Sequence, residues 1–427
     1  MVIALVLLLA VVSVVAGAQW YLWRRLVRDV SAPGGRYRRA GTVLAVVLPL
    51  LSVGAVVGGR LLPLAAERWL AWPGFLWMPS MLYLVLALLV AEPVRYLLLR
   101  RARRAAAAAR VPGAAPERVA VAVGGRSGPD VTEGAAEGAG EREAGEVGEG
   151  SVDPSRRLFV ARTLAVAAGG AAAAVVGNGA YGVLRGPRLK QVTVPLAKLP
   201  RRAHGYRIAV VSDIHLGPIL GRAHTRRIVD TVNGAQPDLI AIVGDLVDGS
   251  VPDLGPAAVP LADLRARDGA YFVTGNHEYF SGAAPWVEFV RELGIHPLEN
   301  ARTELPWFDL AGVNDIAGAA EGHGPDYDRA LGDRDRARTA VLLAHQPVTI
   351  HDTVRYGVDL QLSGHTHGGQ LWPGNYIAEL ANPTVAGLER YGDTQLYVTR
   401  GAGAWGPPVR VGAPSDITVI TLASPAA

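Results

Sequence analysis

The sequence predicts two regions of different fold class, an all-helical membrane region at the N-terminus and an α/β layered domain over residues 190–427. Three long apolar stretches before residue 95 indicate the helices. From Tyr206 onward, short β-branched or apolar runs alternate with longer amphipathic segments, which indicates strands and helices packed in layers. Polar clusters follow several of these runs, as is typical of functional sites in layered α/β domains.

The membrane region is expected to occupy residues 1–104. Its apolar stretches lie at about 2–23, 41–59 and 69–91, and each is long enough to cross a hydrocarbon core of about 30 Å as a helix. Arginines follow the first stretch but do not precede it, so we expect an anchor with its N-terminus outside rather than a cleaved signal. Three crossings then leave residue 95 in the cytoplasm.

Basic residues cluster beside the apolar stretches, at Arg24, Arg25, Arg28, Arg36, Arg38 and Arg39 and again within residues 95–104. Arginines at these places mark cytoplasmic loops, so the formal net charge of +4 indicates the membrane and no nucleic acid as a partner. The chain has no cysteine, which excludes disulfides, thiolate catalysis and cysteine-based zinc sites.

Residues 105–154 are rich in Ala, Gly and Glu without an apolar period, and this composition predicts a disordered, low-complexity linker. The next segment, 155–184, begins with Ser155-Arg156-Arg157 and continues as an Ala- and Gly-rich apolar run. It resembles a twin-arginine export signal, or it is a fourth transmembrane helix. Both alternatives place the following domain outside the cytoplasm. A third alternative is that so weakly apolar a helix, which also carries Arg162, does not span.

The layered domain is expected to contain strands near 207–211, 239–243, 271–274, 308–313, 340–344, 359–362, 396–399 and 417–422. Helices are expected between them, near 224–233, 257–267, 286–293, 326–331 and 348–355.

Polar clusters follow five of the predicted strands: Asp213-Ile214-His215, Gly244-Asp245-Leu246-Val247-Asp248, Gly275-Asn276-His277-Glu278, His345-Gln346, and Gly364-His365-Thr366-His367-Gly368-Gly369-Gln370. Because the carboxyl ends of strands border a common crevice in such domains, these groups are expected to converge on one site.

The side-chain types in these clusters favour a transition-metal site. Imidazole and carboxylate ligands suit zinc, manganese, iron or cobalt. Seven side chains are available as ligands, Asp213, His215, Asp245, Asn276, His345, His365 and His367. One ion with open positions for water and substrate needs fewer, so two divalent ions that share a bridging carboxylate fit better. In Asp-x-His and His-x-His an extended chain would turn both side chains the same way.

The order Asp-x-His, Gly-Asp-x-x-Asp, Gly-Asn-His-Glu, His and Gly-His-x-His resembles the calcineurin-like metallophosphoesterase superfamily over residues 206–422. The resemblance implies a four-layer αββα sandwich with a dinuclear metal centre. It makes Asp213, His215, Asp245 and His367 similar to the ligands of one ion. Asp245, Asn276, His345 and His365 correspond to the ligands of the other, with Asp245 as the bridge.

The same resemblance makes His277 similar to the non-ligand catalytic histidine and Asp248 similar to the carboxylate that orients it. The implied reaction is attack of a metal-activated hydroxide on phosphorus, while His277 protonates the leaving oxygen. An alternative for Asp248 is a turn or capping residue, because Asp-Gly is also a common turn sequence. Glu278 receives no role.

Gly249-Ser250 follows Asp248, where the protein phosphatases of the superfamily have Arg-Gly, so phosphoprotein substrates are not expected. The Gly364–Gln370 run and the Gly- and Pro-rich residues 401–408 look more like the membrane-attached bacterial branch. We therefore expect a membrane-anchored, multi-pass enzyme that cleaves phosphodiester or pyrophosphate bonds of nucleotide or lipid-linked substrates.

Phosphomonoester hydrolysis stays open, because the same ion pair serves either reaction. A non-catalytic sensor would be expected to have lost ligands, and none is missing. A transporter would be expected to carry ionisable groups inside its spans, and these are nearly absent from residues 2–91.

Overall fold

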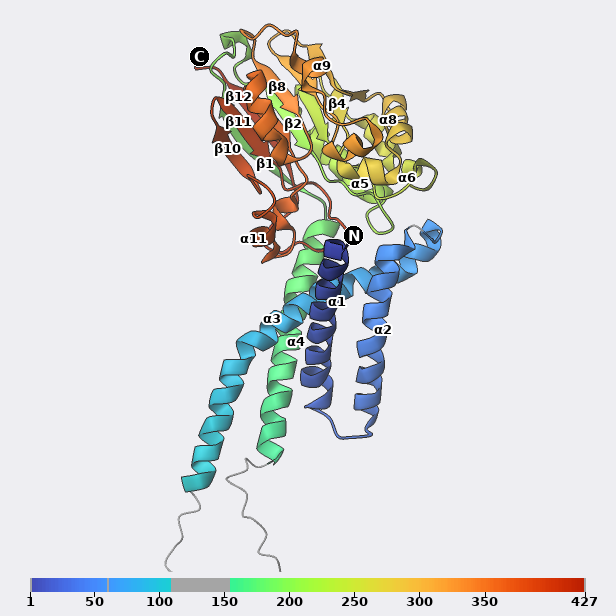
Figure 1. The fold of residues 1–427 in the computed structure, drawn as a ribbon, viewed down its shortest axis with the longest axis vertical. Coiled ribbons are helices and arrows are strands. Elements are labelled where there is room, and N and C mark those ends of the chain that lie inside the picture. The colour runs from blue at the N-terminus through green and yellow to red at the C-terminus, as the bar shows by residue number, and fades with distance from the viewer. Residues whose placement is uncertain (1, 60, 109–153, 426–427) are drawn as a thin grey trace, which may run out of the picture.

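The computed structural model of this chain describes residues 2–59, 61–108 and 154–425. It has an elongated shape, with a bundle of long helices below a layered domain (Figure 1). Most of the predicted linker at 105–154 lies outside the described residues, and its first and last described residues belong to helices.

The N-terminal region consists mainly of long helices, with α1 at Val2–Trp23, α2 at Arg36–Gly58, α3 at Leu64–Ala108 and α4 at Pro154–Leu184. By length and composition, α2, α3 and α4 can each cross a membrane. Helix α3 has 45 residues and contains Pro73, Pro79 and Pro93. Its first part runs obliquely beneath the layered domain before it descends beside α4 (Figure 1). Because proline interrupts helical hydrogen bonding, these positions account for the change of direction.

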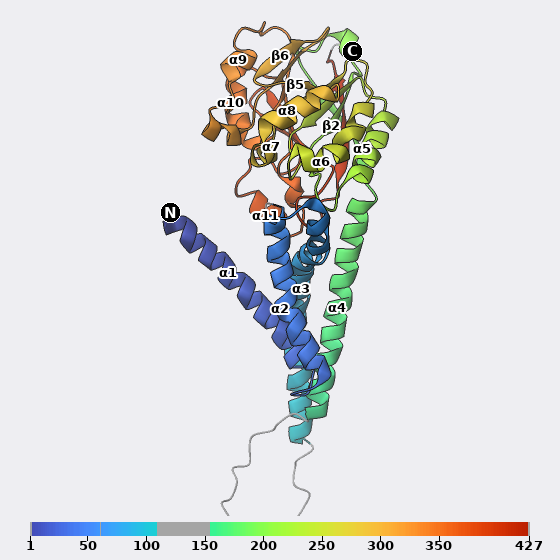
Figure 2. The same ribbon diagram turned by 90° about the vertical axis from the view of Figure 1, so that its right-hand side faces the viewer.

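Figure 2 shows that α1 leans away from the other three helices, whereas α2, α3 and α4 run together under the domain. The ends of the helices alternate, so that α1 and α3 descend away from the domain and α2 and α4 rise toward it. The chain enters the layered domain directly from the upper end of α4.

The layered domain contains two six-stranded sheets, in the orders β1-β12-β2-β3-β4-β5 and β10-β11-β9-β8-β7-β6. The strands of the first sheet are β1 Arg188–Pro195, β12 Asp416–Ala423, β2 Arg207–Val211, β3 Leu239–Val243, β4 Ala270–Val273 and β5 His296–Pro297. Those of the second are β10 Gly387–Tyr391, β11 Thr394–Val398, β9 Leu360–Ser363, β8 Ala340–Leu343, β7 Asp309–Gly312 and β6 Ala301–Glu304. The helices are α5 Arg222–Gly234, α6 Val251–Ala258, α7 Asn276–Ser281, α8 Ala283–Glu292, α9 Tyr327–Leu331, α10 Ile350–Thr353 and α11 Gly374–Ala378.

Buried side chains show four layers. Residues such as Val210, Val243 and Leu343 pack between the two sheets. Helices α5, α6 and α8 cover the outer face of the first sheet, where Ile228 and Trp286 are buried. Helix α9 covers the second sheet through Tyr327 and Ala330. The central strand β3 is buried on both faces, as its unbroken apolar sequence requires. The predicted α/β class and αββα layering are therefore confirmed.

Two differences from the predicted elements have identifiable causes. The helix expected at 257–267 is wrong, because α6 ends at Ala258 and a 3₁₀ turn follows over Val259–Asp263. Pro260 in that turn lacks the N–H that a continuing α-helix needs. Strand β1 was not predicted, because most of its side chains are polar or exposed and its backbone pairs with β12, more than two hundred residues later.

Helices α3 and α4 contact the layered domain along a seam, which we define by Arg68, Tyr83 and Val183 and their partners. The Arg68 Nε donates to the Pro218 carbonyl at 2.8 Å, and the Tyr83 hydroxyl donates to the Trp372 carbonyl at 2.8 Å. Val183 of α4 is buried against Leu220 and Ala404. The domain is thus packed on the helices rather than joined to them by a single strand of chain.

Candidate metal centre

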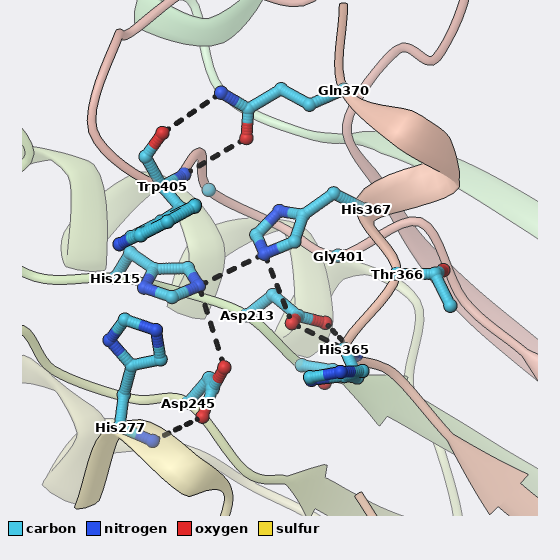
Figure 3. Close-up of polar contacts among 12 residues, drawn as sticks. Asp213, His215, Asp245, His277, His365, Thr366, His367, Gln370, Gly401 and Trp405 are labelled. Atoms are coloured by element: carbon cyan, nitrogen blue, oxygen red, sulfur yellow. Dashed lines mark hydrogen bonds and ion pairs between the residues drawn. The ribbon is translucent and has the colours of Figure 1, made fainter. Parts of the chain in front are cut away.

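The functional side chains predicted from sequence lie at the ends of five strands from both sheets. Strands β2, β3 and β4 of the first sheet lead to Asp213, Asp245 and Asn276 respectively. Strands β8 and β9 of the second sheet lead to His345 and His365. Because the carboxyl ends of these strands border one crevice, residues far apart in sequence come together (Figure 3).

Asp213, His215 and His367 form the first group of possible metal ligands, with ligand atoms within 4.8 Å of one another. The Nε2 atoms of His215 and His367 face each other at 3.1 Å. The Nε2 of His367 lies 3.4 Å from Asp213 Oδ1. Figure 3 shows these side chains pointing toward one point.

Asp245, His345 and His365 form the second group. The Nε2 of His345 lies 3.1 Å from Asp245 Oδ2, and the Nδ1 of His365 lies 3.0 Å from Asn276 Oδ1. Asp245 Oδ2 is also 3.8 Å from His215 Nε2 of the first group. Asp245 therefore lies between the two groups.

This donor set fits divalent cations. Buried imidazole nitrogens and carboxylate oxygens converge, and His345 Nε2 has no hydrogen-bond partner of good geometry although it is buried. Lone pairs that face one another without donors are unfavourable unless a positive charge lies among them. Imidazole, carboxylate and amide ligands of this kind suit manganese, zinc, iron or cobalt.

The electrostatics of the centre also favour positive charge. Burial opposes ionisation of Asp245, but the imidazoles of His345 and His215 hold its pKa below the ordinary value. Burial likewise opposes protonation of His215, but Asp248 and Asp245 raise the pKa of His215 to about 9. Burial raises the pKa of Asp213, which Asp245 raises further. The carboxylates thus create a field in which a cation is stabilised.

Asp248 accepts hydrogen bonds from two histidines. Its Oδ1 lies 2.7 Å from His277 Nδ1 and 2.9 Å from His215 Nδ1. Burial opposes ionisation of Asp248, but His215 and His277 lower its pKa to about 2. With Nδ1 held in this way, His277 presents its Nε2 away from Asp248. The backbone N–H of His277 donates to Asp245 Oδ1 at 2.9 Å.

Two aromatic side chains stand beside His277 at the exposed edge of the centre. The Phe280 ring lies 5.4 Å and the Trp405 ring 5.7 Å from the His277 ring. Both are largely exposed. Gln370 fixes the Trp405 backbone, because its Nε2 donates to the Trp405 carbonyl and its Oε1 accepts from the Trp405 N–H (Figure 3).

The backbone at the candidate ligands differs from the extended geometry expected for Asp-x-His and His-x-His. The five residues Asp213, His215, Asp245, His365 and His367 have φ between 48° and 72°, in the left-handed region. Non-glycine residues rarely adopt this region and do so at some energetic cost, which concentrates at functional sites. The pairs converge because the chain turns sharply after the strand. Gly275 allows that turn to close, since a Cβ there would overlap Asp245.

Glu278 has a structural contact that sequence reasoning missed. Its carboxylate accepts from the N–H groups of Gly275, Asp245 and Leu246 at 2.6, 2.9 and 2.7 Å. Burial and the nearby Asp245 raise the pKa of Glu278 to about 7. This side chain joins the turn that carries Asp245 to the turn that carries Asn276 and His277. Its sequence position after Asn-His gives no sign of these partners.

Arg410 was also missed. It is buried, and its guanidinium lies 3.1 Å from His367 Nδ1 and donates to the His367 carbonyl at 2.9 Å and the Gly403 carbonyl at 2.7 Å. Burial lowers the pKa of Arg410 to about 10. By donating to Nδ1, it leaves Nε2 of His367 directed into the first ligand group.

A family model for calcineurin-like phosphoesterases matches residues 206–369, which contain all nine predicted site residues. A transmembrane protein with metallophosphoesterase domain from Danio rerio is 40% identical over 250 residues, which cover 55% of this chain and 57% of that protein. This chain therefore spans little more than half the length of that relative.

An uncharacterized metallophosphoesterase of Bacillus subtilis is 32% identical over 289 residues, which cover 63% of this chain and 98% of that protein. Among solved structures, a dimetal phosphatase from Danio rerio covers 50% of this chain and 91% of its own at 12% identity, with a TM-score of 0.33. Almost the whole Bacillus subtilis protein aligns with this chain, and the family model matches the residues of the candidate site. This chain therefore belongs to the calcineurin-like phosphoesterase family.

Proposed function

We propose that the domain at 190–427 is a membrane-anchored hydrolase that cleaves phosphate esters with two divalent metal ions. The observation that carries this proposal is the position of Asp245 between two groups of converging ligands. Asp213, His215, Asp245 and His367 would hold one ion. Asp245, Asn276, His345 and His365 would hold the other. When bound, such a pair supplies an activated water and neutralises charge on the phosphate.

The protein residues around the ligands have roles that their contacts support. As the imidazolium, His277 would give a proton from Nε2 to the leaving oxygen, and the Asp248 carboxylate, 2.7 Å from Nδ1, would stabilise that form of the ring. Asp248 fixes the ring orientation of His277 and, through His215 Nδ1, of one ligand. Phe280 and Trp405 form an aromatic wall beside His277, which favours an apolar or aromatic leaving group.

The reaction is tested with the full-length chain purified in detergent. We expect about two transition-metal ions per chain and metal-dependent cleavage of a chromogenic phosphodiester. Asp245→Asn should lose metal and activity together, because this carboxylate would serve both ions. Asp230→Asn, a matched change at an exposed residue of α5, should retain both. A well-folded chain that never retains a divalent ion, or an Asp245→Asn variant with full activity, would contradict the proposal.

We also propose that the substrate is a diester or pyrophosphate rather than a phosphoprotein. This rests on Gly249-Ser250 in place of the arginine that grips phosphate in the protein phosphatases of the superfamily. A panel of soluble monoesters, diesters and pyrophosphates, compared by kcat/KM, tests it. Higher kcat/KM for monoesters would reverse the assignment.

The domain is proposed to lie on the extracytoplasmic side of a multi-pass region, with the segment at 155–184 as a fourth span or export signal. The arginines that follow α1, those that open α2 and those near the end of α3 lie at the helix ends remote from the domain (Figure 1). So do Arg156 and Arg157 at the start of α4. Basic ends stay in the cytoplasm by the positive-inside bias, which supports this orientation. A reporter fused after Ala427 tests it, and activity of a cytoplasm-only reporter would exclude it.

A further inference from the structure

Helix α11 exposes a group of apolar side chains. Trp372, Tyr376, Ile377 and Leu380 are 50%, 60%, 71% and 87% exposed. We call residues 371–380 the α11 segment. From Gly368 to Leu388 the sequence carries one charged residue, Glu379. So many exposed large apolar side chains with so little charge indicate a surface that is covered in the working protein.

The α11 segment begins between two candidate membrane helices. Tyr83 of α3 and Ala172 and Val176 of α4 form a buried cluster with Val409, against which Leu371 and Val411 pack. The hydroxyl of Tyr83 donates to the Trp372 carbonyl. Both views place α11 on the side of the domain that faces the helices (Figures 1 and 2).

The length of α4 indicates the depth at which this contact lies in a bilayer. A hydrocarbon core of about 30 Å takes about 20 helical residues. Counted from Leu158, just after Arg156 and Arg157, about 20 residues reach Asn178, which is the first polar residue after Arg162 and Thr163. Ala172 and Val176 lie on the hydrocarbon side of that boundary. The segment that packs on them therefore lies at the boundary itself, where Trp and Tyr side chains are enriched.

The α11 segment also contacts the metal-ligand loop within the segment itself, and the residues that follow the segment contact the loop as well. Gly369, with φ at +80°, lies so close to the Asn375 backbone that it has no room for a Cβ. On the other side, the hydroxyl of Thr366 donates to the Val385 carbonyl at 2.6 Å. Thr366 stands between the candidate ligands His365 and His367. The contacts therefore fix where α11 lies relative to the centre.

The exposed edge of the centre lies near the helices as well. Trp405 stands beside His277, and its neighbour Ala404 is buried against Val183 of α4. The edge at which a leaving group would depart is thus close to the end of a candidate span.

We propose that the α11 segment lies in the surface of the bilayer that α3 and α4 cross, and that it presents phosphate groups carried by membrane lipids to the His277 side of the metal centre. The location of the α11 segment in the bilayer surface concerns a docking surface only. The presentation of lipid phosphates, the second part of the proposal, rests on the proposed hydrolase function. The occupant of the apolar face is lipid, because the same segment packs on helices that lipid surrounds.

The absence of cysteine allows a direct depth measurement on the full-length chain. Single nitroxide labels are placed at Ile377→Cys, at Leu44→Cys on the exposed face of α2, and at Asp333→Cys, whose side chain is 83% exposed on the domain. In nanodiscs of phosphatidylcholine and phosphatidylglycerol, the label at 377 should collide with oxygen and be shielded from a water-soluble nickel complex, as at 44. Nickel accessibility equal to that at 333 would overturn the proposal.

The second part is tested with two esters that share a p-nitrophenyl leaving group, bis-(p-nitrophenyl) phosphate in water and p-nitrophenyl hexadecyl phosphate in the nanodisc. The double variant Ile377→Glu/Leu380→Glu should cleave the lipid-borne ester several-fold more slowly and the soluble ester at an unchanged rate. Val354→Glu, at an exposed apolar residue of the domain, is the matched control. Equal effects on both esters would overturn lipid presentation. Failure of the unaltered chain to cleave either ester would refute the hydrolase function and leave the depth measurement to decide the docking surface.

Discussion

The candidate metal centre and the seam both join segments that are distant in sequence, but they are held by different interactions. In the centre, single polar groups such as Asp245, Asp248 and Glu278 each make two or more short contacts in a buried or half-buried environment. Across the described part of the seam, two side-chain hydrogen bonds accompany apolar packing. The comparison indicates that one atom can decide chemistry in the centre, whereas the seam distributes its stabilisation over many weak contacts.

Among the variants that test this comparison, His277→Ala is expected to have the largest effect, a loss of kcat. Loss of a general acid lowers kcat by about 10²–10⁴-fold, while metal content should stay unchanged because His277 is not among the proposed ligands. The loss should be greater for an alkyl ester than for a p-nitrophenyl ester, because a poor leaving group depends more on protonation. Steady-state kinetics with both esters and elemental analysis measure this.

His351→Ala, at an exposed histidine of α10, provides the control and should leave both quantities unchanged. If His277→Ala lost metal, His277 would be a ligand, and the assignment of roles in the centre would need revision. Unchanged kinetics with both esters would exclude it as the proton donor.

Arg410→Met tests whether a buried residue next to a candidate ligand affects the affinity of the centre for metal. The substitution removes the donor to His367 Nδ1, so the affinity for metal should fall by about 10–100-fold, as for other groups that orient a ligand histidine. Isothermal titration of the apoprotein with Mn²⁺ or Zn²⁺ measures this. Arg329→Met, on the exposed face of α9, should bind metal normally. Unchanged affinity in Arg410→Met would limit Arg410 to a structural role.

The sequence predicted those parts of the centre whose signal is local. Asp213, His215, Asp245, Asn276, His345, His365 and His367 each follow a recognisable strand, and the topology of a layered domain then brings strand ends together. Arg410 lies 43 residues after its partner His367, in a loop without a period, so no local pattern links them. Glu278 lies three residues after Gly275, but its other contacts depend on a turn from another strand.

The elements of the fold also differ in whether their sequence carries a local signal. Strand β3 is recognisable in the sequence because it consists of five successive apolar residues, all of them buried. Strand β1 is not recognisable in this way, because its mostly exposed residues become a strand only when β12 pairs with them. Composition located the apolar helices, but the oblique course of α3 depends on how its prolines and the domain above it pack. Tertiary contacts decide such features, and a linear pattern does not contain them.

The smallest effect is expected from Tyr83→Phe, which removes the seam hydrogen bond to the Trp372 carbonyl and keeps the ring in its cluster. One net hydrogen bond contributes about 0.5–1.5 kcal/mol, so local opening near Trp372 should become more frequent by a corresponding factor. Hydrogen exchange of the Leu371 and Trp372 amides, which donate to Gly369 and Val411, measures that opening. Metal content and kcat toward a soluble ester should not change, because many apolar contacts still hold the seam. If this one hydroxyl altered metal binding, the seam and the centre would act as a single cooperative unit, and the distinction between a polar centre and a distributed seam would fail.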